Sequence, residues 1–297
     1  MRHARRPSPV RPLAWLAGLC AVFLAGSAVA DPALWEVKGP HAKVYLFGTI
    51  HVLRPSQPWR SAAVDKALAE SQTLWLEIPD SNDLGAARSY IQQLGIDAEH
   101  PLSTKLTPAD LARVDAAAKA LGAPGEARLE PMRPWLAAIT LSVLPALKAG
   151  YDPKSGVEQA LTRQATAEGK PIKGFETLGE QLHFLADLPQ DQEVALLDST
   201  LDDISDAAAK TDEMVHAWAA GDVEKLARLT DEHMKRDSPA LYDLLLTQRN
   251  RNWAATLDER LQGEGVSFVA VGAGHLAGPD SLQHDLEARG YRVVRIH

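Results

Sequence analysis

Two uninterrupted apolar runs near opposite ends of the chain share one pattern. Val44–Phe47 precedes Gly48-Thr49-Ile50-His51, and Phe268–Val271 precedes Gly272-Ala273-Gly274-His275. Continuous apolar runs of this length predict strands of a parallel sheet that is covered on both faces. Open α/β sheets place their chemistry at the carboxyl ends of the strands. We therefore expect one site, built from both ends of the chain, that contains the two histidines.

The remaining pattern places strands at both ends of the chain and helices between them. Near the start, Pro55–Ser71 is expected to be a helix and Thr73–Pro79 a second buried strand, which favours a parallel right-handed crossover. Near the end, a helix is expected over Pro279–Gly290 and a last strand over Tyr291–Ile296. In the middle of the chain, helices are expected to begin at residue 107 and to span Pro134–Ala149, Ser155–Gly169, Thr177–Leu188, Gln190–Ala220 (as one or two helices) and Pro239–Gln262. A short strand is expected at Pro171–Phe175.

This arrangement predicts the α/β (α+β) class. We expect a mixed, partly parallel sheet built from both chain ends, covered by a large helical insertion at about residues 80–235. The length of 297 residues suits one such domain over residues 31–297.

Residues 1–30 have the pattern of a secretory signal peptide. Four arginines precede the apolar run Leu13–Val29, and Ala28-Val29-Ala30 is a small-residue cleavage site before Asp31. The run is short for a membrane span, and nothing after it resembles a second one. We therefore expect export to the periplasm or the medium after cleavage behind Ala30, with no transmembrane segment in the mature chain. The order of residues before Cys20 does not favour a lipid anchor.

Composition excludes several classes of protein. The single cysteine, Cys20, lies in the predicted signal peptide, so the mature chain would have no disulfide, thiol nucleophile or zinc–thiolate site. Cleavage removes four arginines and no acidic residue, which takes the net charge from −8 to −12. An acidic protein lacks the basic surface that nucleic acid requires. A peptide or small molecule is the expected partner; the sequence does not indicate an oligomeric state.

His51, His275 and Glu77 are the first candidates for chemistry. A single histidine at a strand end is commonly a core imidazole, but two in matching context favour a functional site. Gly48, Gly272 and Gly274 are expected to let the backbone turn tightly and approach a ligand closely. Glu77 interrupts an apolar strand, where a carboxylate is costly to bury without a partner or a metal ion. The alternative for Glu77 is an outward-facing residue or a structural ion pair.

Glu158, Glu176 and Arg249 are weaker candidates. Glu158 fits the third position of a capping box with Ser155, which would explain it without a function. Glu176 has no such explanation, whereas Glu180 is explained as the capping partner of Thr177. Arg249, like its neighbour Asn250, would ordinarily belong to the solvated face of a long helix.

The chain resembles the TraB/PrgY/GumN family over nearly its whole predicted mature length. The resemblance lies in LFGTIHVL (46–53), the Glu of LWLEIP, the Gly-Val-Glu at 156–158, GFETLGEQ (174–181), QRNRNW (248–253) and VGAGHLAGPDSL (271–282). This family is similar to the Tiki metalloproteases and, more distantly, to erythromycin-esterase-like hydrolases. The resemblance implies that His51, Glu77 and His275 are central, with Glu158, Glu176 and Arg249 as further members. Some members of the family resemble regulators or accessory exopolysaccharide proteins.

We therefore expect a metal-dependent hydrolase that is peptidase-like. His51, Glu77, Glu176 and His275 would hold one divalent ion, with Mn, Co and Zn all compatible with imidazole and carboxylate ligands. The ion would activate water, Glu158 would act as general base, and Arg249 would neutralise the developing oxyanion. Two alternatives remain open: metal-free hydrolysis with a histidine as general base, and a non-catalytic regulatory protein that binds a peptide or glycan. No organic cofactor is indicated.

Overall fold

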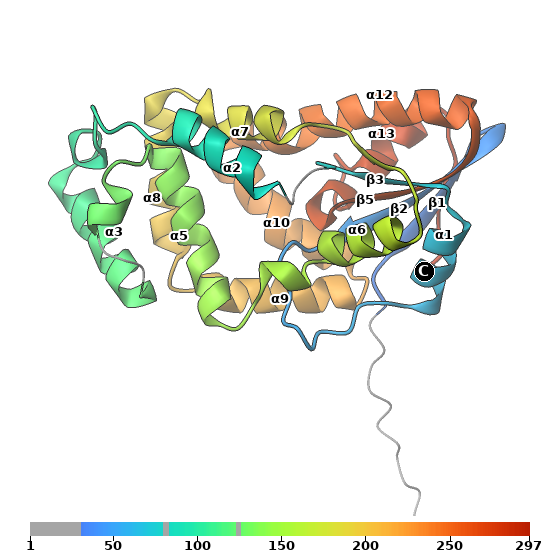
Figure 1. Ribbon diagram of the computed structural model, residues 1–297, viewed down its shortest axis with the longest axis horizontal. Helices are drawn as coiled ribbons and strands as arrows, with labels where there is room; N and C mark the ends of the chain where they lie inside the picture. The colour runs from blue at the N-terminus through green and yellow to red at the C-terminus, as the bar shows by residue number, and fades with distance from the viewer. Residues whose placement is uncertain (1–30, 80–82, 123–125) are drawn as a thin grey trace, which may run out of the picture.

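The structure is a computed structural model that describes residues 31–79, 83–122 and 126–297 (Figure 1). The predicted signal peptide, with Cys20, lies outside the described residues. Within the described part of the chain, no helix is both long enough and apolar enough to span a membrane.

Six strands form one mixed sheet in the order β4-β3-β5-β2-β1-β6. They are β1 (Leu34–Lys38), β2 (His41–Thr49), β3 (Thr73–Leu76), β4 (Ile172–Gly174), β5 (Glu264–Gly272) and β6 (Val293–Arg295). The strands β4, β3, β5 and β2 are mutually parallel, whereas β1 runs antiparallel to both β2 and β6. The predicted fold class is thus confirmed, with β4 contributed by the middle of the chain.

The two Gly-x-x-His strands are neighbours in this sheet. In the parallel pairing of β2 with β5, Gly48 lies opposite Val271 and Thr49 lies opposite Gly272. Because parallel neighbours end at the same edge of a sheet, both motifs leave it side by side. Strand β1 was not predicted, although Leu34, Trp35 and Val37 are buried in it.

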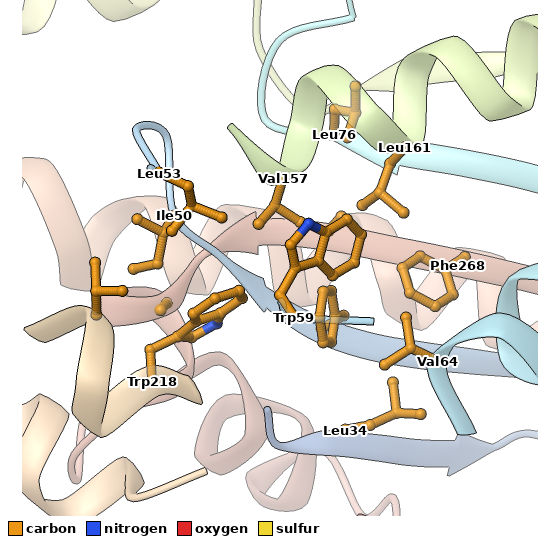
Figure 2. Close-up of a cluster of buried hydrophobic side chains, with 14 of the residues drawn as sticks. Leu34, Ile50, Leu53, Trp59, Val64, Leu76, Val157, Leu161, Trp218 and Phe268 are labelled. Atoms are coloured by element: carbon orange, nitrogen blue, oxygen red, sulfur yellow. The ribbon is translucent and has the colours of Figure 1, made fainter. Parts of the chain in front are cut away.

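Alternate residues of the central strands pack into two separate hydrophobic cores. Tyr45 and Phe47 of β2 join the core that contains α1, α6 and α9 residues, and Figure 2 shows this cluster around Trp59, Val157 and Trp218. Val44 and Leu46 point to the opposite face, which α12 and α13 cover. Burial on both faces explains why the central segments Val44–Phe47 and Phe268–Val271 are apolar without interruption.

The described residues form more α-helices than the sequence predicts, and most of these are shorter than expected. They are α1 (Ala62–Glu70), α2 (Leu84–Tyr90), α3 (Pro108–Leu121), α4 (Glu126–Leu129), α5 (Pro134–Lys148), α6 (Val157–Ala167), α7 (Leu178–Ala186), α8 (Gln190–Asp203), α9 (Ala207–Ala219), α10 (Val223–Asp237), α11 (Pro239–Tyr242), α12 (Gln248–Gln262) and α13 (Leu282–Ala288). Short 3-10 helices are η2 (Leu102–Thr104), η3 (Pro153–Ser155) and η5 (Ala273–Leu276), and π-helical turns are η1 (Ile91–Gly95) and η4 (Asp243–Thr247).

Several helix boundaries differ from the sequence expectation. Helix α1 begins only after Ser61, whose hydroxyl caps Val64 N–H, because the prolines at 55 and 58 disfavour helix before them. The segment expected over Pro239–Gln262 is interrupted by the π-helical turn η4, and α10 was not predicted as a separate helix. Helices α3, α5 and α8 share a further core and lie at the end of the molecule away from the sheet (Figure 1).

Candidate active site

The residues singled out in the sequence follow the ends of the four parallel strands. His51 comes after β2, Glu77 after β3, Glu176 after β4, and His275 lies in η5 directly after β5. The carboxyl ends of parallel strands form one edge of the sheet, where open α/β folds bind their ligands. The topology therefore gathers side chains that are as much as 224 residues apart along the chain.

Three of these side chains surround a single point in front of Gly272. A Cβ atom placed on Gly272 would lie 3.0 Å from Glu77 Oε1, 3.7 Å from His275 Cδ2 and 3.9 Å from His51 Nε2. Glycine leaves this space open. The structure thus places both imidazoles and the carboxylate on the same side of the sheet edge, around a space that a small group can enter.

His51 is held by the carboxylate of Glu158. The two side chains meet at 2.6 Å between Nδ1 and Oε1, and the Thr49 hydroxyl donates to the same oxygen. Helix α6 is capped by Gly156 without a side-chain hydrogen bond, so the capping box expected between Ser155 and Glu158 is absent. Glu158 is therefore free to bind His51, and the interpretation of it as a helix cap is wrong. The capping box of Thr177 with Glu180 is present.

This pair shifts the protonation of both partners. The negative charge of Glu158 raises the pKa of His51 to about 9, although burial of part of the ring opposes the shift. Burial opposes ionisation of Glu158, but the charge of His51 outweighs it and lowers the Glu158 pKa. The His51 side chain is 70% exposed, so solvent screens part of this interaction. At neutral pH the pair is an imidazolium bound to a carboxylate.

Glu77 is a buried carboxylate with a partner for each oxygen. Oε1 accepts from Gly272 N–H at 2.6 Å, and Oε2 accepts from Arg249 Nη2 at 2.7 Å and from Gln181 Nε2 at 3.0 Å. Burial would raise the pKa of Glu77, but His275 in its protonated form, the charge of Arg249 and the backbone N–H hold it far below its ordinary value. Oε1 also borders the space in front of Gly272.

Arg249 uses all five of its N–H groups within the protein. Nε and Nη2 donate to Glu176, Nη2 also to Glu77, and Nη1 to the carbonyl of Leu245 at 3.0 Å and to His275 Nε2 at 3.1 Å. A guanidinium has five donors. All five donors are thus engaged here, so the oxyanion role that the sequence suggested for Arg249 would require one of these hydrogen bonds to be exchanged. Arg249 is 8% exposed, so its expected place on a solvated helix face is wrong.

Glu176 is committed to the same cluster. Its carboxylate accepts hydrogen bonds from Arg249, from Gln181 Nε2 at 2.8 Å and from Trp253 Nε1 at 2.9 Å. These three donors leave little room for a metal ion at Glu176. The cluster binds the ends of β3 and β4 to the start of α12.

The hydrogen bonds around His275 define its tautomer. Asn250 Nδ2 donates to the carbonyl of Asp280 at 2.8 Å, so Asn250 Oδ1 faces His275 Nδ1 at 2.7 Å. An amide oxygen only accepts, so Nδ1 carries the proton. Nε2 then has a lone pair, which accepts from Arg249. Asn250 is completely buried, contrary to its expected exposure.

Burial keeps His275 neutral. The residue is 6% exposed, and its ring lies 4.3 Å from that of Trp253, centroid to centroid. Burial lowers the pKa of His275 to about 4, and the attraction of Glu77 for the protonated form only partly opposes this. The two histidines of the repeated motif therefore differ: His51 is charged and exposed at neutral pH, and His275 is neutral and buried.

A pocket of about 230 Å³ opens onto this cluster. It is lined by His51, Leu76, Glu77, Ile78, Pro153, Glu158, Gln159 and Gln181. Polar groups that converge in a largely apolar pocket are typical of ligand sites. The volume suits a side chain or a small group.

The residues fit a divalent ion only in part. No three His, Cys, Asp or Glu side chains in the described ranges are arranged to hold one, so the four-residue ligand set expected from the sequence is not formed. Glu176 is bound to Arg249, which also donates to His275 Nε2. His51 Nε2 and Glu77 Oε1 do face the space at Gly272, and Nε2 of His275 lies 3.9 Å from Glu77 Oε1.

The three glycines act through close approach rather than through a positive φ. None of Gly48, Gly272 and Gly274 has a positive φ. A Cβ on Gly48 would lie 3.1 Å from Ala273 Cα, so its absence lets β2 approach the loop that carries His275. Gly272 opens the space beside Glu77. The expected tight turns are therefore made without a positive φ, and close approach of a ligand at Gly272 stays a prediction.

Sequence reasoning missed four members of the site. Thr49, Gln181 and Trp253 contact its carboxylates, and Asn250 orients His275. The available signal was their place within the motifs GTIH, GFETLGEQ and QRNRNW, all shared with the family that the chain resembles.

Comparison with known proteins now supports that resemblance directly. The sequence profile of the TraB/PrgY/gumN family matches residues 33–295, and the chain belongs to this family. It is also similar to an uncharacterized protein of Treponema pallidum (strain Nichols), with 21% identity over 262 residues, which cover 84% of this chain and 78% of the relative. No solved structure matches significantly.

Proposed function

We propose that the protein is a hydrolase whose reacting atoms lie in front of Gly272, between His51 and Glu77. The observation that carries this proposal is the pair formed by His51 and Glu158. Nδ1 of the ring is fixed by a carboxylate, while Nε2 faces a pocket that Glu77 also lines. An imidazole oriented in this way is suited to general acid–base catalysis.

In this proposal, His51 exchanges a proton with water. The water lies between His51 Nε2 and Glu77 Oε1, and its oxygen attacks the carbonyl carbon of an amide or ester. The neutral ring accepts the water proton and then donates it to the leaving group. Glu158 stabilises the imidazolium, while Arg249 and Gln181 hold Glu77 in place. Activity should rise with pH as His51 loses its proton, up to about pH 9.

The guanidinium of Arg249 favours a reaction without a metal ion. It already supplies the positive charge that Glu77 and Glu176 require, and a second cation beside it would be repelled.

A metal-dependent hydrolase is the second candidate. Each imidazole has its Nδ1 held by an oxygen and its Nε2 directed at the site, which is the usual arrangement of metal-bound histidine. His51, Glu77 and His275 would be the ligands if Arg249 moved away from His275. Such an ion would lower the pKa of bound water.

Elemental analysis and a chelator separate the two candidates. Purified protein would be assayed against mixed fluorogenic peptides and esters, before and after dialysis with a chelator and after addition of Mn, Co or Zn. If the protein is a metal-free hydrolase, as we propose, the turnover rate should be the same before and after dialysis with the chelator. Loss of turnover that Mn, Co or Zn restores would instead support the metal-dependent candidate. Binding of peptides or glycans without turnover would support the non-catalytic alternative and contradict both.

A further inference from the structure

The loop that carries His275 rests on a buried carboxyl group of α10. A Cβ on Gly274 would lie 3.5 Å from Asp231 Oδ1, and one on Gly278 would lie 3.2 Å from Asp231 Oδ2. Gly278 also has a φ of 70°, which favours glycine. The two glycines on either side of His275 thus leave the space that the Asp231 side chain occupies. Asp231 is not among the residues that line the pocket.

Asp231 has too few hydrogen-bond donors around it for an ionised carboxylate. The residue is 3% exposed, and Oδ2 has no hydrogen-bond partner. Oδ1 lies 2.6 Å from Thr230 Oγ1, but that hydroxyl also donates to the carbonyl of Leu226 at 2.9 Å. A hydroxyl has one proton and cannot fully satisfy both acceptors. A proton on Oδ1 of Asp231, donated to Thr230 Oγ1, resolves the conflict.

The charges around Asp231 also disfavour its ionised form. Burial raises the pKa of Asp231 to about 7, with Asp280 and Glu232 adding to the shift. Lys235 opposes it, but its Nζ is paired with Asp280 at 2.6 Å, and Tyr242 donates to the same carboxylate. No cation within the described part of the chain is therefore paired with Asp231 itself.

We propose that Asp231 is a positioning residue for His275, which it supports in the protonated form and releases when it ionises. A buried, unpaired carboxylate is costly, so ionisation would drive α10 and the loop apart or admit water between them. The movement would displace His275 relative to Asn250 and Arg249. This inference deepens the proposed function because it makes the second histidine of the site sensitive to pH near neutrality.

Spectra of the His275 ring test this without any substrate. The His275 pKa of about 4 means that the ring does not itself titrate near neutral pH. In protein with ¹⁵N-labelled histidine, the two ring nitrogens of His275 should nevertheless shift with a midpoint near pH 7. In Asp231→Asn, a neutral side chain of the same shape, the step should vanish. Glu232→Gln, the same change at the exposed neighbouring residue, should retain it.

A second variant guards against loss of folding in Asp231→Asn. The charge of Lys235 lowers the Asp231 pKa and its side chain is half exposed, so Lys235→Gln should keep the fold and move the midpoint in the His275 spectrum to higher pH. A step that persists in Asp231→Asn, or that is absent from the wild type, would overturn the proposal. Neither result depends on turnover, so failure here is distinct from failure of the proposed hydrolase activity.

Discussion

At the scale of single residues, the same motif produces two histidines with opposite properties. His51 faces solvent and a carboxylate, which raises its pKa, whereas His275 is enclosed by Trp253, Asn250 and Arg249, and burial lowers its pKa. Groups whose environments push their pKa values apart are candidates for different roles in acid–base chemistry. The repeat in the sequence therefore predicts where both rings lie, but their different environments come from residues outside the repeat.

Glu158→Gln should lower the pKa of His51. The carboxylate is the main cause of the raised value of about 9, so without its charge the pKa should fall toward the ordinary value of about 6.5. The rising part of the pH–activity profile should then move to lower pH. A histidine titration followed by NMR measures the pKa directly. An unchanged His51 pKa would show that the ion pair is not formed in solution.

His275→Ala should destabilise the fold as well as reduce activity. The ring is buried and both of its nitrogens are hydrogen-bonded, so truncation leaves Asn250 and Arg249 with unpaired groups at a cost of about 1–3 kcal/mol. At about 2–4 °C per kcal/mol, the melting temperature should fall by several degrees. A melting temperature equal to that of the wild type would contradict the buried network.

The pH dependence of stability follows from the same burial. The folded-state pKa of His275, about 4, lies below its unfolded value of about 6.5, so the unfolded chain binds more protons between these values. His275 thus contributes stability above about pH 6.5 that is lost as the pH falls toward 4. In His275→Ala, the free energy of unfolding should therefore fall less steeply between about pH 6.5 and pH 4. Denaturant titrations at several pH values measure this. An unchanged slope would contradict it.

At the scale of elements, the parallel strands could be predicted and the site around them only in part. Val44–Phe47 and Phe268–Val271 are apolar without interruption because both faces are covered, and that pattern is readable. Arg249 and Asn250 were misjudged because polar residues on a helix ordinarily face water. Their burial depends on Glu176, Glu77 and His275, which satisfy them from distant parts of the chain, and no local pattern encodes such pairing.

Gly272→Ala should disable the site while leaving the sheet intact. The new Cβ would lie 3.0 Å from Glu77 Oε1, so the carboxylate must move from its position beside His51. We expect a loss of activity of roughly 100-fold or more, within the range that general acid–base groups contribute. Gly263→Ala, just before the opposite end of β5, has no atom nearer than 3.4 Å and should be neutral. Equal activity of the two variants would show that the space at Gly272 is not used.

At the scale of the whole molecule, the sheet edge organises everything that the proposal requires. Strands β2, β3, β4 and β5 deliver His51, Glu77, Glu176 and His275, and α6 and α12 add Glu158 and Arg249. The family assignment covers this entire arrangement, since it spans residues 33–295.

The proposed export after Ala30 would be checked by the intact mass of the protein from a periplasmic fraction, with Asp31 as the first residue.

The most direct test of the central claim is hydrolysis by the wild type and by His51→Ala, measured side by side on the same fluorogenic peptides and esters. The His51 side chain is 70% exposed, but its removal leaves the Glu158 carboxylate without its cation, so the melting temperature of the variant is measured to confirm that it is folded under the assay conditions. The account predicts turnover by the wild type and a loss of roughly 100- to 10,000-fold in the variant. A folded variant that hydrolyses the substrates as fast as the wild type would contradict the account.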